Sequence, residues 1–103
     1  MEIVDKDRFD ELVQGDKLLV VDFFANWCMP CKMLSPVLDA LAEKYTDQIT
    51  VVKVDVDESS DLAKSFGILS IPCVIVFKQG AEADRIIGFT QLDDICTIID
   101  NNL

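Results

Sequence analysis

Three nearly uninterrupted apolar segments constrain the fold of this chain more than any other feature. They cover residues 18–25, 49–56 and 73–78. A strand with one face in water alternates apolar and polar residues, whereas a strand covered on both faces is apolar throughout. Between the first two segments, apolar residues recur at helical spacing, at Cys31, Leu34, Leu38, Leu41 and Tyr45. An adjacent second stripe of Met33, Val37 and Ala40 predicts a long, well-buried helix. We therefore predict an α/β domain in which helices cover both faces of a mixed sheet.

Shorter signals complete this architecture. Asp5 is a good N-cap for a helix that stops at Gly15, and Gln79-Gly80 marks a turn between two antiparallel strands. The remaining elements are a short edge strand at 2–4, a helix capped by Ser59 or Ser60 that ends at Gly67, a return strand at 83–87, and a last helix burying Leu92, Ile95, Cys96 and Ile99. The total is about five strands and about four helices. A chain of 103 residues suits a single domain over residues 1–103.

Composition excludes several classes of function. The chain has no histidine, which rules out Ser-His-Asp and Cys-His catalysis and imidazole metal ligands. Its net charge of -10 disfavours nucleic acid and anionic membranes as partners. No apolar run approaches the ~20 residues of a membrane span, and residues 1–7 do not resemble a signal peptide. We therefore expect a cytoplasmic protein, in which cysteines are more often catalytic, metal-bound or buried than structural.

The sharpest chemical signal is Trp27-Cys28-Met29-Pro30-Cys31-Lys32, which follows a buried strand and opens the long helix. Residues three apart in a helical turn have Cα atoms about 5–6 Å apart, within the range of a disulfide. Cys28 and Cys31 can therefore form a disulfide and separate again with little movement. Pro30 falls in the first turn, where its missing N–H costs nothing. Cys28 lies at the helix N-terminus, which favours a thiolate, whereas Cys31 should be more buried.

This asymmetry predicts the roles of the two cysteines. Cys28 attacks a target disulfide, and Cys31 resolves the mixed disulfide that forms. Two alternatives stay open from the residues alone, namely thiols that merely pack and half of a zinc site. A four-cysteine site would also need Cys73 and Cys96, and this spacing is poor for a zinc ribbon, so we predict no metal.

The segment from Val21 to Lys32 closely resembles the active-site segment of the thioredoxin family. The resemblance continues in order through Pro36, Val54-Asp55-Val56-Asp57, Phe66-Gly67-Ile68, Ser70-Ile71-Pro72, Val76-Phe77-Lys78-Gln79-Gly80 and Gly88. It implies the thioredoxin fold and a protein-disulfide reductase without a cofactor. It also implies a thioredoxin reductase-type enzyme that recharges the dithiol, client proteins that contain disulfides, and a monomer.

Two charged residues within the apolar strands gain a role from the resemblance. Asp22 matches a buried carboxylate that helps to deprotonate the resolving cysteine, here Cys31. Burial without a partner would raise the pKa of Asp22 and make it a usable proton acceptor. The alternative is a carboxylate in water at the end of a strand, which burial would not affect. Lys53 matches a lysine near that carboxylate; the alternative is a charge that reaches the surface.

The resemblance also implies a substrate-binding rim. Pro72 matches a cis-proline that faces the cysteines, and the backbone beside it, at Ile71, pairs with the substrate chain. Trp27, Ile71, Pro72 and Gly88 would form an apolar rim around Cys28. Met29, Pro30 and Pro72 are the residues that we expect to tune the redox properties of the pair.

The chain departs from the family pattern at several positions. Met29 stands where glycine is usual, Phe24 where tryptophan is frequent, and Cys73 where threonine is common. Cys73 is either a small core residue or a third thiol that intercepts oxidised Cys28, and Cys96 belongs to the core. Two other functions remain alternatives: a binding subunit on the same fold, and a thiol oxidase or isomerase if the redox potential is high.

Overall fold

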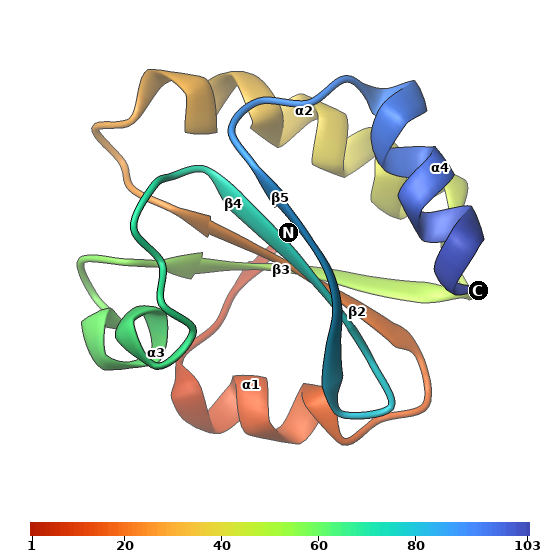
Figure 1. Ribbon diagram of the computed structural model, residues 1–103, viewed down its shortest axis with the longest axis horizontal. Coiled ribbons are helices and arrows are strands. Elements are labelled where there is room, and N and C mark those ends of the chain that lie inside the picture. The colour runs from red at the N-terminus through yellow and green to blue at the C-terminus, as the bar shows by residue number, and fades with distance from the viewer.

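The computed structural model describes residues 1–103 as an alternation of strands and helices (Figure 1). The elements in chain order are β1 (Glu2–Ile3), α1 (Lys6–Val13), β2 (Leu18–Phe24), α2 (Met29–Lys44), β3 (Ile49–Asp55), α3 (Ser60–Ser65), β4 (Cys73–Lys78), β5 (Ala81–Ile87) and α4 (Leu92–Asn102). None of the helices has the length and apolar character needed to cross a membrane.

The five strands form one mixed sheet in the order β1-β3-β2-β4-β5. β3 runs parallel to both β1 and β2, whereas β4 is antiparallel to β2 and to β5. β2 is the central strand, and all seven of its residues are buried. The predicted fold class, a mixed sheet of about five strands with about four helices, is confirmed.

The helices cover both faces of the sheet, with α2 and α4 on one face and α1 and α3 on the other (Figure 1). Alternate residues of β2 serve the two cores. Leu18 and Val20 pack with Leu34, Leu38 and Ile95 in the core under α2 and α4. The opposite face carries Leu19, Val21, Phe23, Val52, Val54, Ile75 and Phe77, which pack with Phe9 of α1 and with Leu62 and Ala63 of α3. This two-sided burial is why β2 contains almost no polar residue.

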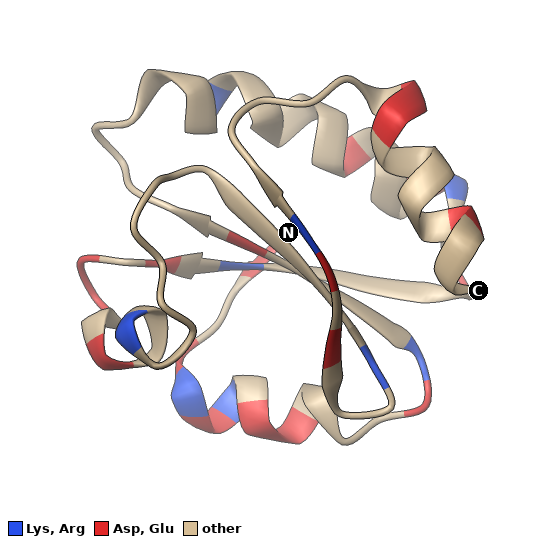
Figure 2. Ribbon diagram, viewed as in Figure 1, with Lys and Arg blue, Asp and Glu red and all other residues tan.

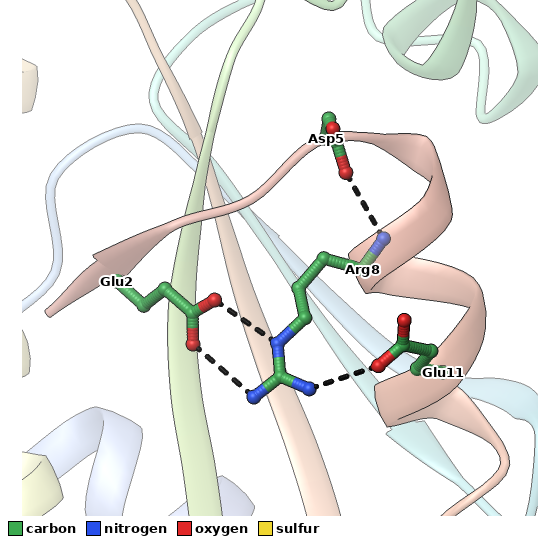
Figure 3. Close-up of polar contacts among 4 residues, drawn as sticks. All are labelled: Glu2, Asp5, Arg8 and Glu11. Atoms are coloured by element: carbon green, nitrogen blue, oxygen red, sulfur yellow. Dashed lines mark hydrogen bonds and ion pairs between the residues drawn. The ribbon is translucent and has the colours of Figure 1, made fainter.

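Local interactions fix the ends of several elements. Asp5 caps α1 by accepting a hydrogen bond from the Arg8 amide at 3.0 Å. The Arg8 guanidinium donates to Glu2 and to Glu11, which ties β1 to α1 (Figure 3). Because these side chains are largely exposed, water and salt screen the ion pairs, and each contributes little to stability.

The turn between β4 and β5 also follows the sequence pattern. Gln79 and Gly80 have φ angles of 52° and 83°, which are the values that a tight two-residue hairpin requires. β5, however, begins at Ala81 rather than at residue 83. It is an edge strand, and its exposed residues lack the alternation by which strands are recognised.

The long helix differs from the sequence pattern on one side. The stripe of Cys31, Leu34, Leu38, Leu41 and Tyr45 is buried as predicted. The second stripe is not, because Met33 is 57 % exposed and Val37 and Ala40 are only half-buried. α2 therefore packs on the sheet mainly through the first stripe, with Val37 at the edge of that core, and Met33 is left as exposed apolar surface.

Candidate active site

Cys28 and Cys31 lie where the central strand passes into the long helix. β2 ends at Phe24, and after a short turn Cys28 becomes the N-cap residue of α2. The Cys28 amide donates to the Ala25 carbonyl at 3.2 Å, which closes that turn. The two cysteines form a disulfide with Cα atoms 5.3 Å apart, within the range that the spacing predicted. The connection from β2 into α2 carries no charged residue (Figure 2).

The start of α2 places a hydrogen-bond donor on the Cys28 sulfur. The backbone N–H of Cys31 points at Cys28 Sγ, with an N···S distance of 3.3 Å. Pro30 occupies the first turn and contributes no N–H. A helix N-terminus stabilises negative charge through its free N–H groups and its dipole, so this position favours a thiolate at Cys28 once the disulfide is reduced.

Burial distinguishes the two cysteines only slightly. Cys28 is 5 % exposed and Cys31 is 2 % exposed, and both pack on Phe24 and Ala25. The predicted order of burial is therefore correct, but the difference is small. The position of each sulfur on the helix, rather than its overall burial, separates their chemistry.

Asp22 is fully buried in β2, on the same face of the strand as Phe24. Neither carboxylate oxygen has a hydrogen-bond partner. Desolvation raises the pKa of Asp22 from 3.8 to about 6, and the positive charge of Lys53 lowers it by a smaller amount. A carboxylate in water at a strand end is therefore the wrong interpretation of Asp22.

Lys53 is the neighbour of Asp22 in the sheet, because the two residues are paired in the parallel register of β2 and β3. Its Nζ atom lies 4.2 Å from the centre of the Phe24 ring, a cation–π contact that holds the half-buried side chain over the sheet. A cleft of about 210 Å³ opens beside it. The cleft is lined by Phe24, Ala25, Asn26, Cys31, Lys32, Ser35 and Lys53, so Cys31 and Lys53 share one opening to solvent.

The loop before β4 approaches the disulfide from the other side. The Ile71–Pro72 peptide bond is cis, and the Ile71 carbonyl oxygen lies 3.9 Å from Cys28 Sγ. The Gly88 amide donates to the Pro72 carbonyl at 2.8 Å. The structure thus brings Cys28, Ile71, Pro72 and Gly88 together.

The expected rim is only partly at the surface. Trp27 is 71 % exposed, and Ile71 and Gly88 are half-buried. Pro72 is buried, because the loop turns inward here to enter β4, so its side chain lies beneath the rim rather than on it. Met29 is 63 % exposed and adds apolar surface next to Cys28.

Sequence reasoning missed a polar network beside the disulfide. Trp27 Nε1 donates to Asp57 at 3.0 Å, and the Asn26 amide group donates to Asp55 at 3.3 Å. Asp55 ends β3, is buried, and also accepts from the backbone amides of Asp57 and Glu58. An aspartate that ends a strand and bonds the amide two residues on forms an Asx turn, and this local signal was present in the sequence.

The other two cysteines lie in the cores on opposite faces of the sheet. Cys73 is 1 % exposed and packs with the residues under α1 and α3, and desolvation raises the pKa of its thiol. Cys96 is on the buried face of α4 and packs in the core between the sheet, α2 and α4, as expected for a core residue. A zinc site made of all four cysteines is therefore the wrong interpretation, and Cys73 is positioned as a core residue.

Comparison with known proteins places the whole chain in one family. The family model "Thioredoxin" matches residues 1–101. The thioredoxin of Alicyclobacillus acidocaldarius is 47 % identical over 88 residues, which cover 85 % of this chain and 84 % of that protein. The thioredoxin of Staphylococcus haemolyticus is 42 % identical over 100 residues, which cover 97 % and 95 % of the two chains.

Solved structures agree with this assignment. Plasmodium falciparum thioredoxin superposes with a TM-score of 0.91 at 33 % identity and covers 100 % of both chains. Malassezia sympodialis thioredoxin gives a TM-score of 0.90 at 34 % identity, over 99 % of this chain and 90 % of its own. The fold, the Cys28–Cys31 pair and these matches lead to one conclusion: the chain belongs to the thioredoxin family and is a dithiol–disulfide oxidoreductase.

Proposed function

We propose that Cys28 is the attacking thiolate, and Cys31 the resolving thiol, by which the protein reduces disulfides in client proteins. The observation that carries this assignment is the Cys31 N–H directed at Cys28 Sγ at the N-cap of α2. Only one of the two sulfurs occupies that position. A lower thiol pKa gives more thiolate at neutral pH, and the thiolate is the species that attacks a disulfide.

The reaction takes place in two exchange steps. The Cys28 thiolate attacks one sulfur of the client disulfide, whose S–S bond breaks, and the released client thiolate takes up a proton. Cys31 then loses its proton and attacks Cys28 Sγ. The mixed disulfide breaks, the second client thiol leaves, and the Cys28–Cys31 disulfide forms. Two electrons pass from the protein to the client.

Asp22 is the proposed acceptor of the Cys31 proton. A carboxylate with a pKa of about 6 is mostly ionised at neutral pH and is still basic enough to accept a proton. The positive charge of Lys53 lowers the pKa of Asp22, against the larger effect of desolvation, and so favours the ionised carboxylate. The cleft that Cys31 and Lys53 share gives water a route by which the proton can leave.

Partner binding follows from the surface around Cys28. We assign client docking to Trp27, Ile71 and Gly88, with Met29 as additional apolar contact. Met29, Pro30 and Pro72 are the residues proposed to tune the redox potential of the pair. Met29 and Pro30 stand between the two cysteines, and Pro72 belongs to the loop that contacts Cys28. No Gly-x-Gly-x-x-Gly motif for a nicotinamide or flavin is present, so a separate thioredoxin reductase-type enzyme would recharge the dithiol in a reducing cytoplasm.

Insulin reduction in the presence of dithiothreitol tests the assignment. We expect Cys28→Ser to abolish the acceleration over dithiothreitol alone. Cys96→Ala is the matched control, because it removes a buried thiol on α4 and should retain activity. Full activity of Cys28→Ser would overturn the assignment of the attacking cysteine.

A further inference from the structure

The edge strand β5 contains a bulge that places two charged residues on one face. In the β4–β5 ladder, Ile75 pairs with Arg85 and Phe77 pairs with Glu82. One residue of β4 thus lies opposite two residues of β5, and Ala83 is the extra one. Side chains three apart in a regular strand point to opposite faces, but across this bulge Glu82 and Arg85 share the face covered by α3.

The bulge allows Glu82 to orient the Arg85 guanidinium. Arg85 Nε and Nη2 donate to the two carboxylate oxygens of Glu82 at 2.9 and 2.8 Å. The same Nη2 atom donates to the Phe66 carbonyl at 2.8 Å. Phe66 is the C-cap residue of α3, where helix carbonyls lack a partner within the helix. Arg85 therefore caps α3 from a neighbouring strand, 19 residues along the chain.

β5 also holds the other end of the segment that follows α3. The Gly88 amide, just beyond β5, donates to the Pro72 carbonyl at 2.8 Å. Between these two attachments, only the amides of Gly67 and Ile68 donate hydrogen bonds, both back to α3. Ile68 packs on the core under α1 and α3, and Ile71 packs on the cluster of Phe24, Ala25 and the two cysteines, whereas Leu69 is 96 % exposed. The two attachments to β5 supply the hydrogen bonds that connect this segment to the rest of the sheet.

We propose that Arg85 is a positioning residue for client docking, because it holds the segment that carries Ile71 against Cys28. The inference rests on the proposed function, in which Ile71 contacts the client. Arg85 touches neither cysteine, and the chemistry at Cys28 needs only a reachable disulfide. Loss of Arg85 should weaken the binding of a protein disulfide without slowing exchange with a small one.

Arg85→Met tests the proposal, because it removes the guanidinium and keeps the aliphatic stem. Arg8→Met is the matched control. It also removes one arginine paired with glutamates (Figure 3), and α1 lies on the face of the sheet opposite α2 (Figure 1). Arg85→Lys retains a single donor for the Phe66 carbonyl and should give an intermediate result. It also serves as the test variant if Arg85→Met does not fold.

Steady-state kinetics with insulin and exchange with a small aromatic disulfide provide the first readout. We expect Arg85→Met to raise the KM for insulin about three- to tenfold, as loss of one hydrogen bond would. Its kcat and its rate with the small disulfide should stay within about twofold of Arg8→Met, because the cysteines are untouched. Equal KM values in the two variants would overturn the proposal. An equal loss of rate with the small disulfide would also overturn it.

Amide hydrogen exchange provides a readout that needs no activity. The Gly67 and Ile68 amides should exchange about three- to tenfold faster in Arg85→Met than in Arg8→Met, because the end of α3 loses its cap. Unchanged exchange would show that Arg85 does not hold the segment. Wild-type protein that fails to reduce insulin would instead refute the proposed function, whatever the exchange rates show.

Discussion

Replacing the buried carboxylate of Asp22 should stabilise the protein at neutral pH. Asp22 is fully buried without a hydrogen-bond partner, and its pKa rises from 3.8 to about 6. The ionised form is therefore disfavoured in the folded protein relative to the unfolded chain. At about 1.36 kcal/mol for each pH unit between the two values, the cost of ionising Asp22 in the folded state is about 3 kcal/mol.

The sign of the pH dependence follows from linkage. Below the unfolded pKa of 3.8, Asp22 is protonated in both states and its ionisation costs nothing. Between pH 3.8 and about 6, the folded state binds more protons than the unfolded state, so this residue lowers stability as pH rises. Above about pH 6 the whole destabilisation is present. Asp22→Asn removes it, so the gain should appear between these pH values and persist above them.

Urea unfolding of the oxidised protein measures this effect. The stability difference between Asp22→Asn and wild type is determined at pH 4 and at pH 8, and the two differences are subtracted. This subtraction cancels the pH-independent cost of burying an unpaired amide, which is about 1–3 kcal/mol. The variant should gain about 2.5 kcal/mol at pH 8 relative to pH 4, because about 0.5 kcal/mol of the cost is already present at pH 4.

Two further variants sharpen the result. Asp39→Asn is the control, because it removes one negative charge from an exposed position on α2. Its stability difference from wild type should change by only a few tenths of a kcal/mol between pH 4 and pH 8. Lys53→Met should move the Asp22 transition to higher pH, because the lysine charge lowers the Asp22 pKa. An Asp22→Asn effect that is the same at pH 4 and pH 8 would refute the raised pKa and remove the basis for proton transfer from Cys31.

Three further predictions concern the surroundings of the disulfide. In the reduced, folded protein, iodoacetamide should modify Cys28 far faster than Cys73, because Cys73 is buried and its pKa is raised; comparable labelling in peptide maps would contradict this. Gly88→Ala should lower the free energy of unfolding by about 1 kcal/mol or more, because the φ angle of Gly88 is +90°; an unchanged urea midpoint would contradict this. In a glutathione redox series, the Cys28–Cys31 potential should lie below that of the glutathione couple; a higher value would indicate an oxidase or isomerase.

The parts of the fold that depend on apolar pattern could be predicted from the sequence. β2 was predicted within one residue, because a strand buried on both faces is an unbroken apolar run, which a half-exposed strand or a surface helix does not contain. The start of β5 was missed, because an exposed edge strand needs no such pattern. Met33 was wrongly placed in a buried stripe, because apolar residues also occur at protein surfaces.

The candidate site likewise contains features that a local sequence pattern predicts and features that it does not. The position of the two cysteines followed from strand, helix and spacing. The apolar neighbours of Asp22 left a strand-end carboxylate in water as an alternative, and its burial was implied by resemblance to the family. The cis bond before Pro72 was implied only by resemblance to the family. The pairs Trp27–Asp57 and Arg85–Phe66 join residues 30 and 19 positions apart, and no local pattern specifies such contacts. They depend on how the sheet brings distant segments together.

Trapping of the mixed disulfide tests the central claim most directly. Cys31→Ser and Cys28→Ser proteins are mixed with a disulfide-containing client, quenched with acid and mapped by mass spectrometry. We expect Cys31→Ser to accumulate a mixed disulfide through Cys28, because the attack proceeds and the resolving thiol is missing. Cys28→Ser should accumulate none. A mixed disulfide through Cys31 in the Cys28→Ser protein, formed as fast as the one through Cys28, would contradict the assignment of Cys28 as the attacking cysteine.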